Sequence, residues 1–386
     1  PNSTFVLIYG NKDESETIFH EELHALQLKN LGRFFVHSVY SQANVAGELF
    51  EHIYWKKPFT TVLDESKIPF YKWFEDGTTN ASYNCLDLNI EKGLGNKTAI
   101  IFEADNGEVS QITYKELYEQ VCQFANGLKT FNLNIGDRVV IYLPMGIEAV
   151  VAMLACSRIG LTHSVVFGGF SAKSIQERIK DAKAKLVITS DIQYRGGKTL
   201  PLKATVDEAL NLGSCESIIN AVILKKSKDT IALKSKETWW HDLIKNQSTD
   251  CDPVYVNAEH PLFLLYTSGS TGKPKGVVHT TAGYMVWANY TFVNVFQYQP
   301  GQVHFCTADI GWITGHSYII YGPLSAGATS LMFEGVPTWP DAGRFWEIVE
   351  KHKVDILYTA PTAIRSLMGF GTDFIEGKDL GSLKVL

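Results

Sequence analysis

A short glycine-rich segment carries the residue types that bind a polyphosphate. It reads Tyr266-Thr267-Ser268-Gly269-Ser270-Thr271-Gly272-Lys273-Pro274-Lys275-Gly276. Glycines let a backbone approach a ligand without a Cβ clash, hydroxyls donate hydrogen bonds, and the lysines supply positive charge. The segment is not a Walker A loop, because its first lysine comes too early and Pro274 stands where Ser or Thr is needed. On composition alone, a surface turn that binds nothing explains it equally well.

In two further segments, charged or bulky side chains stand next to glycines, whose backbone is conformationally free. Arg195-Gly196-Gly197-Lys198 places two cations around two glycines, an arrangement that can grip a phosphate and that, by itself, is usually a solvated turn. Trp312-Ile313-Thr314 follows Gly311. Taken as an isolated apolar pair, Trp312 and Ile313 would be core residues.

His20-Glu21-Glu22-Leu23-His24 satisfies the H-E-x-x-H pattern of zinc proteases. On a helix both histidines would share one face, with Glu21 as a general base. Five-residue patterns also arise by chance, and no clear third ligand follows, since His37 falls in an expected strand. We therefore do not favour the protease interpretation.

Strand and helix patterns alternate around these segments. Buried strands are expected at 138–142, 164–167, 186–189, 261–266, 330–333 and 355–358. Helices are expected at 146–158, at 171–184 with Ser171 as N-cap, at 282–296 and at 344–353. The polar stretch 225–252 is expected to be an irregular connection. The alternation favours an α/β fold of parallel sheets flanked by helices, in which loops that follow strands bind phosphates.

Composition narrows the class of protein. With 386 residues, 45% of them apolar, the chain can bury a core and form two or three domains. A net charge of -6 argues against a nucleic-acid binder. The apolar stretches are too short to span a membrane. Six scattered cysteines without a Cys-x-x-Cys pair fit reduced thiols in a cytoplasmic compartment.

The ordered glycine-rich string resembles the signature loop of adenylate-forming enzymes, and further strings narrow the resemblance to the AMP-forming acetyl-CoA synthetases. The strings that agree with that family lie at 69–77, 84–87, 153–156, 165–170, 307–318, 333–337 and 358–363. The match covers residues 52–386. It implies the α/β fold of the large N-terminal domain of these enzymes, with residues 52–98 as their N-terminal segment and 99–386 as the AMP-binding domain.

The resemblance implies a function and a set of site residues. The reaction is the ligation of acetate to CoA with ATP and Mg²⁺, through an acetyl-adenylate, with small molecules as the only partners. The loop over the ATP phosphates is Thr267, Ser268, Gly269, Ser270, Thr271, Gly272, Lys273, Lys275 and Gly276, with Thr267 and Lys275 as catalytic residues. The acetate pocket is Trp312, Ile313 and Thr314. The CoA contacts are Arg195, Gly196, Gly197, Lys198, Thr314 and Thr338, the last of which is usually Asn in the family.

Several alternatives stay open. One methylene changes binding by only about 1–3 kcal/mol, so propionate or another short-chain acid is an alternative substrate. Family members occur in mitochondria as well as in the cytoplasm. Residues 1–51 resemble a fragment of a ferredoxin-reductase-type NAD-binding domain or are a divergent extension. Segments of the family that follow the matched part are absent up to Leu386, so we expect this chain to be inactive alone; a fragment that only binds CoA or nucleotide is the remaining alternative.

Overall fold

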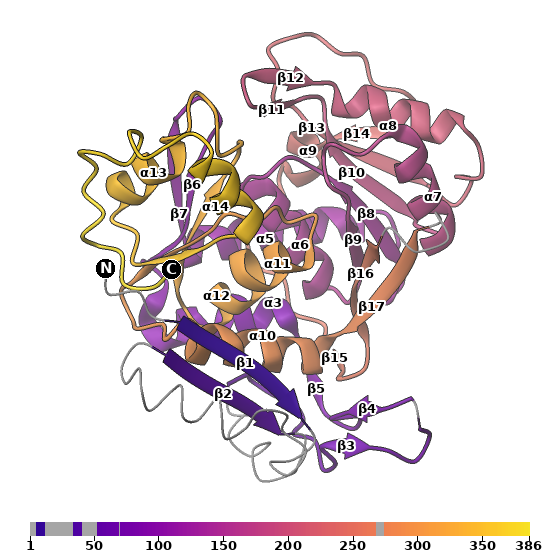
Figure 1. The fold of residues 1–386 in the computed structure, drawn as a ribbon. Helices are drawn as coiled ribbons and strands as arrows, with labels where there is room; N and C mark the ends of the chain where they lie inside the picture. Colours follow the sequence, from indigo (N-terminus) through magenta and orange to yellow (C-terminus); the bar gives the residue numbers. More distant parts are fainter. Residues whose placement is uncertain (1–4, 12–33, 41–51, 69, 268–273) are drawn as a thin grey trace.

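A computed structural model describes residues 5–11, 34–40, 52–68, 70–267 and 274–386 of the chain. Two β-sheets and the helices that cover them form its body (Figure 1). None of the described helices has the length and apolarity that a membrane crossing requires.

The larger sheet of the described residues has seven strands in the order β14-β13-β10-β8-β9-β16-β17. Neighbouring strands are parallel, except that β16 and β17 are antiparallel. The bounds are β8 (Arg138–Tyr142), β9 (Thr162–Val165), β10 (Leu186–Ser190), β13 (Asn220–Leu224), β14 (Glu237–Trp239), β16 (Pro261–Thr267) and β17 (Lys275–Thr280). The expected parallel sheet is confirmed.

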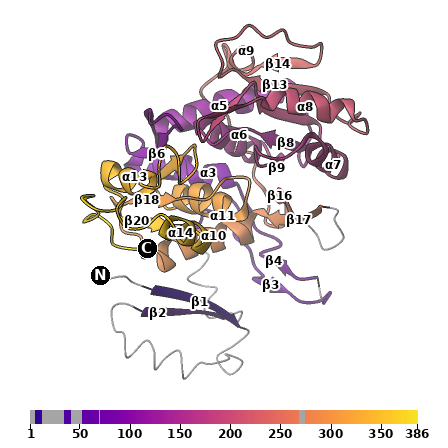
Figure 2. The ribbon, with the colours of Figure 1, turned by 45° about the horizontal axis from the view of Figure 1, so that its top comes forward.

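Helices cover both faces of this sheet (Figure 2). They are α5 (Tyr114–Lys129), α6 (Ile147–Arg158), α7 (Ala172–Ala182), α8 (Leu202–Asn211) and α9 (Trp240–Ile244). Strand β8 shows the consequence: Val140 and Tyr142 pack in a cluster with α7 and α8, whereas Val139 and Ile141 belong to the large core on the other side. A strand buried on both faces therefore reads as a continuous apolar run.

The second sheet has five described strands in the order β20-β18-β19-β6-β7, parallel except for the pair β6 and β7. Its strands are β6 (Thr98–Glu103), β7 (Val109–Thr113), β18 (Val303–Cys306), β19 (Thr329–Phe333) and β20 (Ile356–Tyr358). Helices α13 (Arg344–His352) and α14 (Pro361–Met368) pack with this sheet in a separate apolar cluster.

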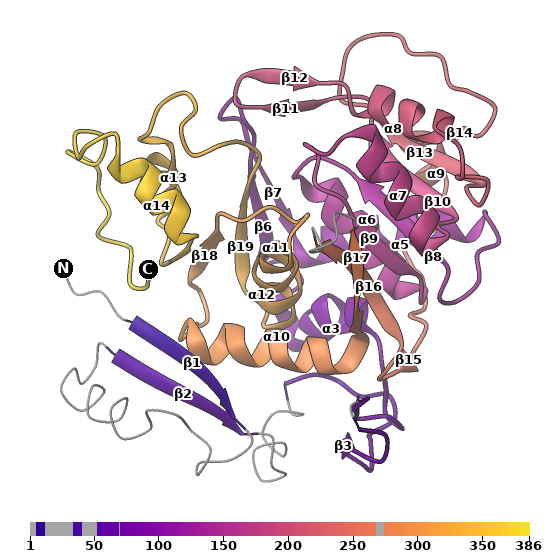
Figure 3. The same cartoon turned by 45° about the vertical axis from the view of Figure 1, so that its right-hand side comes forward.

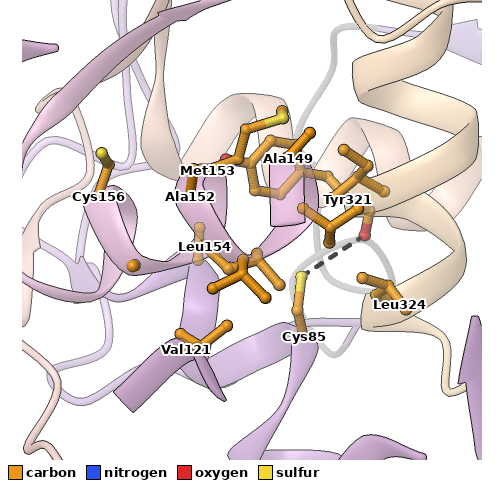
Figure 4. Packing of buried hydrophobic residues seen from close by; sticks show 14 of the residues in the cluster. Cys85, Val121, Ala149, Ala152, Met153, Leu154, Cys156, Tyr321 and Leu324 are labelled. Atoms are coloured by element: carbon orange, nitrogen blue, oxygen red, sulfur yellow. Dashed lines mark hydrogen bonds between the residues drawn. The ribbon is translucent and has the colours of Figure 1, made fainter. Parts of the chain in front are cut away.

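The large core joins the two sheets through α3 (Ala81–Cys85), α6, α10 (Thr281–Val295) and α12 (Gly322–Ser325). Figure 4 shows Cys85, Val121, Met153 and Tyr321 converging there from four segments far apart in the sequence. Burial raises the pKa of the Cys85 thiol, so this cysteine acts as a small apolar group.

The remaining elements of the described chain lie outside these two sheets. They are β1 (Phe5–Asn11) and β2 (Phe34–Tyr40), which are parallel to each other, β3 (Leu63–Asp64), β4 (Lys72–Trp73), β5 (Thr78–Thr79), α4 (Asp87–Asn89), β11 (Gln193–Arg195), β12 (Lys198–Leu200), β15 (Val256–Asn257), α11 (Ile313–Gly315), and the π-helical segments η2 (Ile90–Leu94) and η3 (His316–Tyr321). The H-E-x-x-H segment, 20–24, lies outside the described residues.

The start and the end of α7 follow from local sequence signals. The Ser171 side chain accepts a hydrogen bond from the Ser174 backbone N–H, as an N-cap should. Lys183 adopts a left-handed conformation, with φ of 49°, and ends the helix one residue after Ala182. The predicted helix at 171–184 is thus confirmed, with slightly shorter bounds.

The prediction that 225–252 is irregular was wrong for 237–244, whereas 225–236 and 245–252 hold no helix or strand. This stretch holds the edge strand β14, which pairs with β13, and the helix α9. Trp240 stacks on Phe124 of α5 with ring centroids 3.7 Å apart, and Leu243 is also buried. These elements were not predicted because three to five residues show too little periodicity to detect, and because their neighbours in the sequence are polar.

Candidate functional site

The glycine-rich segment joins two strands that lie side by side. Thr267 ends β16, Lys275 begins β17, and the two residues are directly opposite each other in the antiparallel pair. Both residues and Gly276 are exposed. The remaining predicted loop residues, Ser268 to Lys273, lie outside the described residues. The strand pairing thus brings together the two residues expected to be catalytic.

The first strand of this hairpin is anchored to α7 through Tyr266. The Tyr266 hydroxyl donates to Asp181 Oδ2 at 2.7 Å, and burial and Asp181 raise the pKa of the phenol, so it stays a donor. The guanidinium of Arg178 lies 5.3 Å from the centre of the Tyr266 ring. Arg178 is itself buried, and burial lowers its pKa from the usual value. The residue before Thr267 is therefore held in place.

The predicted acyl segment lies at the start of α11, between the two sheets (Figure 3). Trp312 is the N-cap of α11 and is 49% exposed, and Ile313 is 42% exposed, so neither is a core residue. The Trp312 ring lies 6.3 Å from that of Phe167 and 6.1 Å from that of Phe170, between centroids. Two bulky side chains thus face the indole from the loop after β9.

Phe170 connects the predicted acyl segment, residues 312–314, with the hairpin of β16 and β17. The same Arg178 guanidinium that lies over Tyr266 lies 4.8 Å from the Phe170 ring centre. Since Phe170 also contacts Trp312, one chain of ring contacts runs from β16 to α11. These side chains therefore join the strand that ends in Thr267 to the turn that carries Trp312.

Arg195 approaches the acyl segment from the other direction. Its Nη1 lies 3.5 Å from Asp309 Oδ2, and its guanidinium lies 5.1 Å from the Phe167 ring centre. Asp309 Oδ1 accepts the Gly311 backbone N–H at 2.8 Å. Burial raises the pKa of Asp309, while Gly311 and Arg195 act against that rise. Arg195 therefore sits next to the turn that carries Trp312.

The turn between β11 and β12 is formed by the two glycines of the basic segment. Gly196 and Gly197 have φ of 59° and 73°, which only glycine adopts readily. Their backbone N–H groups donate to the two carboxylate oxygens of Asp105 at 2.7 and 2.8 Å. Because a carboxylate already binds these N–H groups, the side chains of Arg195 and Lys198 are the groups that can meet a phosphate.

A cavity of about 750 Å³ lies beside the hairpin of β11 and β12. Its walls include Asp105, Glu148, Gly197, Lys226, Glu334 and Trp339. The Trp339 ring lies so close to Gly197 that a Cβ there would be 2.5 Å from it. Thr338, the neighbour of Trp339, is partly exposed. The basic turn and the segment of Thr338 therefore meet at the cavity, whose walls include neither Trp312 nor Lys275.

Three groups of predicted residues are thus brought together: Thr267 with Lys275, Arg195 with the Trp312 turn, and Gly197 with the segment of Thr338. Within the described ranges, no group of three or more His, Cys, Asp or Glu could hold a metal ion.

Two family models match this sequence. The one described as AMP-binding enzyme matches residues 89–386, more than half of the chain. The chain belongs to the AMP-binding enzyme family. The other model, described as acetyl-coenzyme A synthetase N-terminus, matches residues 47–85.

This AMP-binding enzyme is similar to curated proteins named acetyl-coenzyme A synthetase. One from Herminiimonas arsenicoxydans is 60% identical over 319 residues, which are 82% of this chain and 48% of the relative. One from Chromobacterium violaceum is 59% identical over 337 residues, 87% of this chain and 51% of the relative. The chain spans about half the length of the curated relatives it matches. The matches confirm the resemblance that the motifs predicted.

Sequence reasoning missed several residues that contact the candidate site of this AMP-binding enzyme. Phe167 and Phe170 stand within a string that carried the resemblance, so that string was a usable signal. Arg178 and Asp105 belong to no motif. Asp105 lies 91 positions from the Gly196 amide that it binds, and nothing in the sequence indicates that pairing.

Gly315 provides a test of the tight turn that carries Trp312. A Cβ at Gly315 would lie 2.2 Å from the Asp309 carbonyl oxygen, so Gly315→Ala must displace backbone. We expect it to lower the free energy of unfolding by about 3 kcal/mol, measured by urea denaturation. The control is Gly283→Ala in α10, where the nearest atom is 3.8 Å from the added Cβ; it should stabilise the helix by about 0.5–1 kcal/mol. Equal effects of both changes would contradict the tight turn.

Proposed function

We propose that this AMP-binding enzyme ligates acetate to CoA with ATP, through an acetyl-adenylate. One observation supports this most: the turn of Trp312 packs beside Phe167 and Phe170, with Arg195 next to it and the Thr267–Lys275 strand pair linked through Arg178. A small acyl pocket would thus lie between a phosphate-binding hairpin and a cationic turn. The names of the relatives point to the same substrates.

The proposed reaction has two displacements. A carboxylate oxygen of acetate attacks the α-phosphorus of ATP, and the bond to the pyrophosphate leaving group breaks. The CoA sulfur then attacks the carbonyl carbon of acetyl-adenylate and loses its proton, and AMP leaves with the oxygen that came from acetate. Neither step requires a nucleophile from the protein, so the side chains act by positioning and by stabilising charge.

The roles of the side chains are those that the family resemblance implies, and the pairing of Thr267 with Lys275 supports them. Thr267 and Lys275 would flank the ATP phosphates, with Ser268, Gly269, Ser270, Thr271, Gly272, Lys273 and Gly276 completing the loop around them. Mg²⁺ would enter as the magnesium complex of ATP, in which it neutralises phosphate charge.

Acetate would bind against Trp312, Ile313 and Thr314. CoA would reach the same turn from the basic hairpin. Arg195 and Lys198 would meet its phosphates, Gly196 and Gly197 would shape the turn, and Thr314 and Thr338 would offer hydroxyl groups.

The proposal is tested with the full product of the gene by acetate-dependent exchange of labelled pyrophosphate into ATP. We expect exchange without CoA, and acetyl-CoA with AMP once CoA is added. Exchange with propionate at equal efficiency would assign a broader short-chain specificity. No exchange with any short carboxylic acid would refute adenylation at this site.

Trp312 should limit the length of the acyl chain. Trp312→Ala removes the indole that faces Phe167 and Phe170, so we expect kcat/KM for propionate relative to acetate to rise about tenfold. Trp287→Ala is the control, since Trp287 is similarly exposed (46%) but lies on α10. An unchanged ratio in Trp312→Ala would show that this indole does not bound the pocket.

A further inference from the structure

His316 is buried four positions after Trp312, the first residue of the proposed acyl segment. It begins η3, its side chain is fully buried, and its Nδ1 lies 3.1 Å from the Trp312 carbonyl oxygen. Its backbone N–H donates to the same oxygen at 3.1 Å. We propose that His316 is a positioning residue for the acyl pocket, whose imidazole N–H fixes the turn of Trp312, Ile313 and Thr314. This inference rests on the proposed function.

The ring of His316 is held on two sides. Its centroid lies 4.6 Å from that of Phe263 and 5.5 Å from that of His163, with which it stacks. His163 in turn lies with its Nε2 2.6 Å from the Tyr321 hydroxyl. Phe263 belongs to β16, the strand that ends in Thr267. The imidazole therefore packs on β16 and, at the same time, contacts the carbonyl oxygen of Trp312.

The hydrogen bond fixes which nitrogen carries the proton. A carbonyl oxygen only accepts, so Nδ1 must be the donor, because an unprotonated Nδ1 would direct its lone pair at the lone pairs of the oxygen. Burial lowers the pKa of His316 to about 3, so the ring is neutral and has a single N–H near pH 7. The other nitrogen, Nε2, is buried without a hydrogen-bond partner in the described structure. The geometry thus places the proton of the ring on Nδ1, facing the Trp312 carbonyl oxygen.

The turn needs this restraint because its outer side is open. Trp312 and Ile313 are about half exposed, and the rings described against the Trp312 indole, those of Phe167 and Phe170, both come from the loop after β9. A shift of about 1 Å in a binding group can lower turnover about a hundredfold. Fixing the Trp312 carbonyl limits such shifts without occupying space in the pocket.

Two substitutions separate donation from packing. His316→Phe keeps a flat ring but loses the N–H, whereas His316→Asn loses the ring but places an amide N–H the same number of bonds from Cβ as Nδ1. We expect His316→Phe to raise KM for acetate about tenfold, with KM for ATP changed less than about twofold. His316→Asn should keep KM for acetate within about threefold of wild type, although its melting temperature falls further.

His304→Phe is the matched control. His304 is also fully buried, its Nε2 lies 2.9 Å from the Tyr318 carbonyl oxygen, and burial lowers its pKa to about 4. The His304→Phe variant should be less stable than the wild type, without a selective change in KM for acetate. The assay uses the full gene product and steady-state kinetics with acetate and ATP varied in turn.

Three outcomes are distinguishable. A selective rise in KM for acetate in His316→Phe that His316→Asn largely reverses supports the positioning role. A wild-type KM in His316→Phe, or a loss in His316→Asn as large as that in His316→Phe, overturns it and makes His316 a packing residue. A wild-type protein that does not activate acetate overturns the proposed function itself, and the positioning role with it.

Discussion

Lys275→Ala is expected to reduce acetate-dependent pyrophosphate exchange about 10²–10³-fold, the loss seen when one group that stabilises transition-state charge is removed. Lys275 begins β17 directly opposite Thr267, and its side chain is exposed toward solvent, where a polyphosphate can reach it. Negative charge develops on the pyrophosphate as it leaves, so the ammonium should stabilise the transition state more than bound ATP. The fall should therefore appear mainly in kcat.

Steady-state exchange kinetics at varied ATP measure this effect. Lys275→Arg should retain more activity than Lys275→Ala, since it keeps the positive charge. Lys236→Ala, at another exposed lysine, should exchange at the wild-type rate. If Lys275→Ala changed only KM for ATP, the lysine would bind ATP without stabilising the transition state.

Asp87→Asn is expected to destabilise the fold by about 3–5 kcal/mol, because it leaves a buried arginine without its counter-ion. Arg158 is only 1% exposed. Its Nη1 and Nη2 donate to the two Asp87 carboxylate oxygens at 2.7 and 2.9 Å, and its guanidinium lies 4.9 Å from the Tyr118 ring centre. Asp87 and the hydrogen bonds of this pair raise the pKa of Arg158 against burial, so the arginine stays charged.

Urea denaturation measures the loss. Asp379→Asn is the control, because Asp379 pairs with Lys353 at a similar distance, 2.7 Å, but on the surface, where such pairs contribute little. The double change Asp87→Asn with Arg158→Met should recover most of the stability, since no unpaired charge is left behind. A loss no larger in Asp87→Asn than in Asp379→Asn would contradict a buried, paired arginine.

The fold was largely predictable from periodicity. The strand at 138–142 was predicted with the bounds that β8 has, since a doubly buried parallel strand is a plain apolar run. The cap at Ser171 and the helix after it were also predictable, because both signals are local. β14 and α9 were not, since each spans too few residues to show a period.

For the candidate site, the sequence predicted segments but not the contacts that join them. The composition of the glycine-rich string permitted a phosphate loop, and the resemblance to adenylate-forming enzymes assigned that role to it and the acetate pocket to Trp312. The contacts that position these parts join residues far apart in the sequence, such as Tyr266 with Asp181, 85 positions apart. His316 lies inside a matching string, yet its proposed role involves a ring from β16, that of Phe263, which only the fold brings beside it.

The most direct test of acetate adenylation follows the oxygen of acetate. Acetate labelled with ¹⁸O in both carboxylate positions is incubated with ATP, CoA, Mg²⁺ and the full gene product, and AMP is analysed by mass spectrometry. We predict one ¹⁸O atom in the phosphate of AMP and none in pyrophosphate, because the carboxylate oxygen bonds to the α-phosphorus. Label in inorganic phosphate, with ADP as the nucleotide product, would show an acyl-phosphate route and would contradict the account.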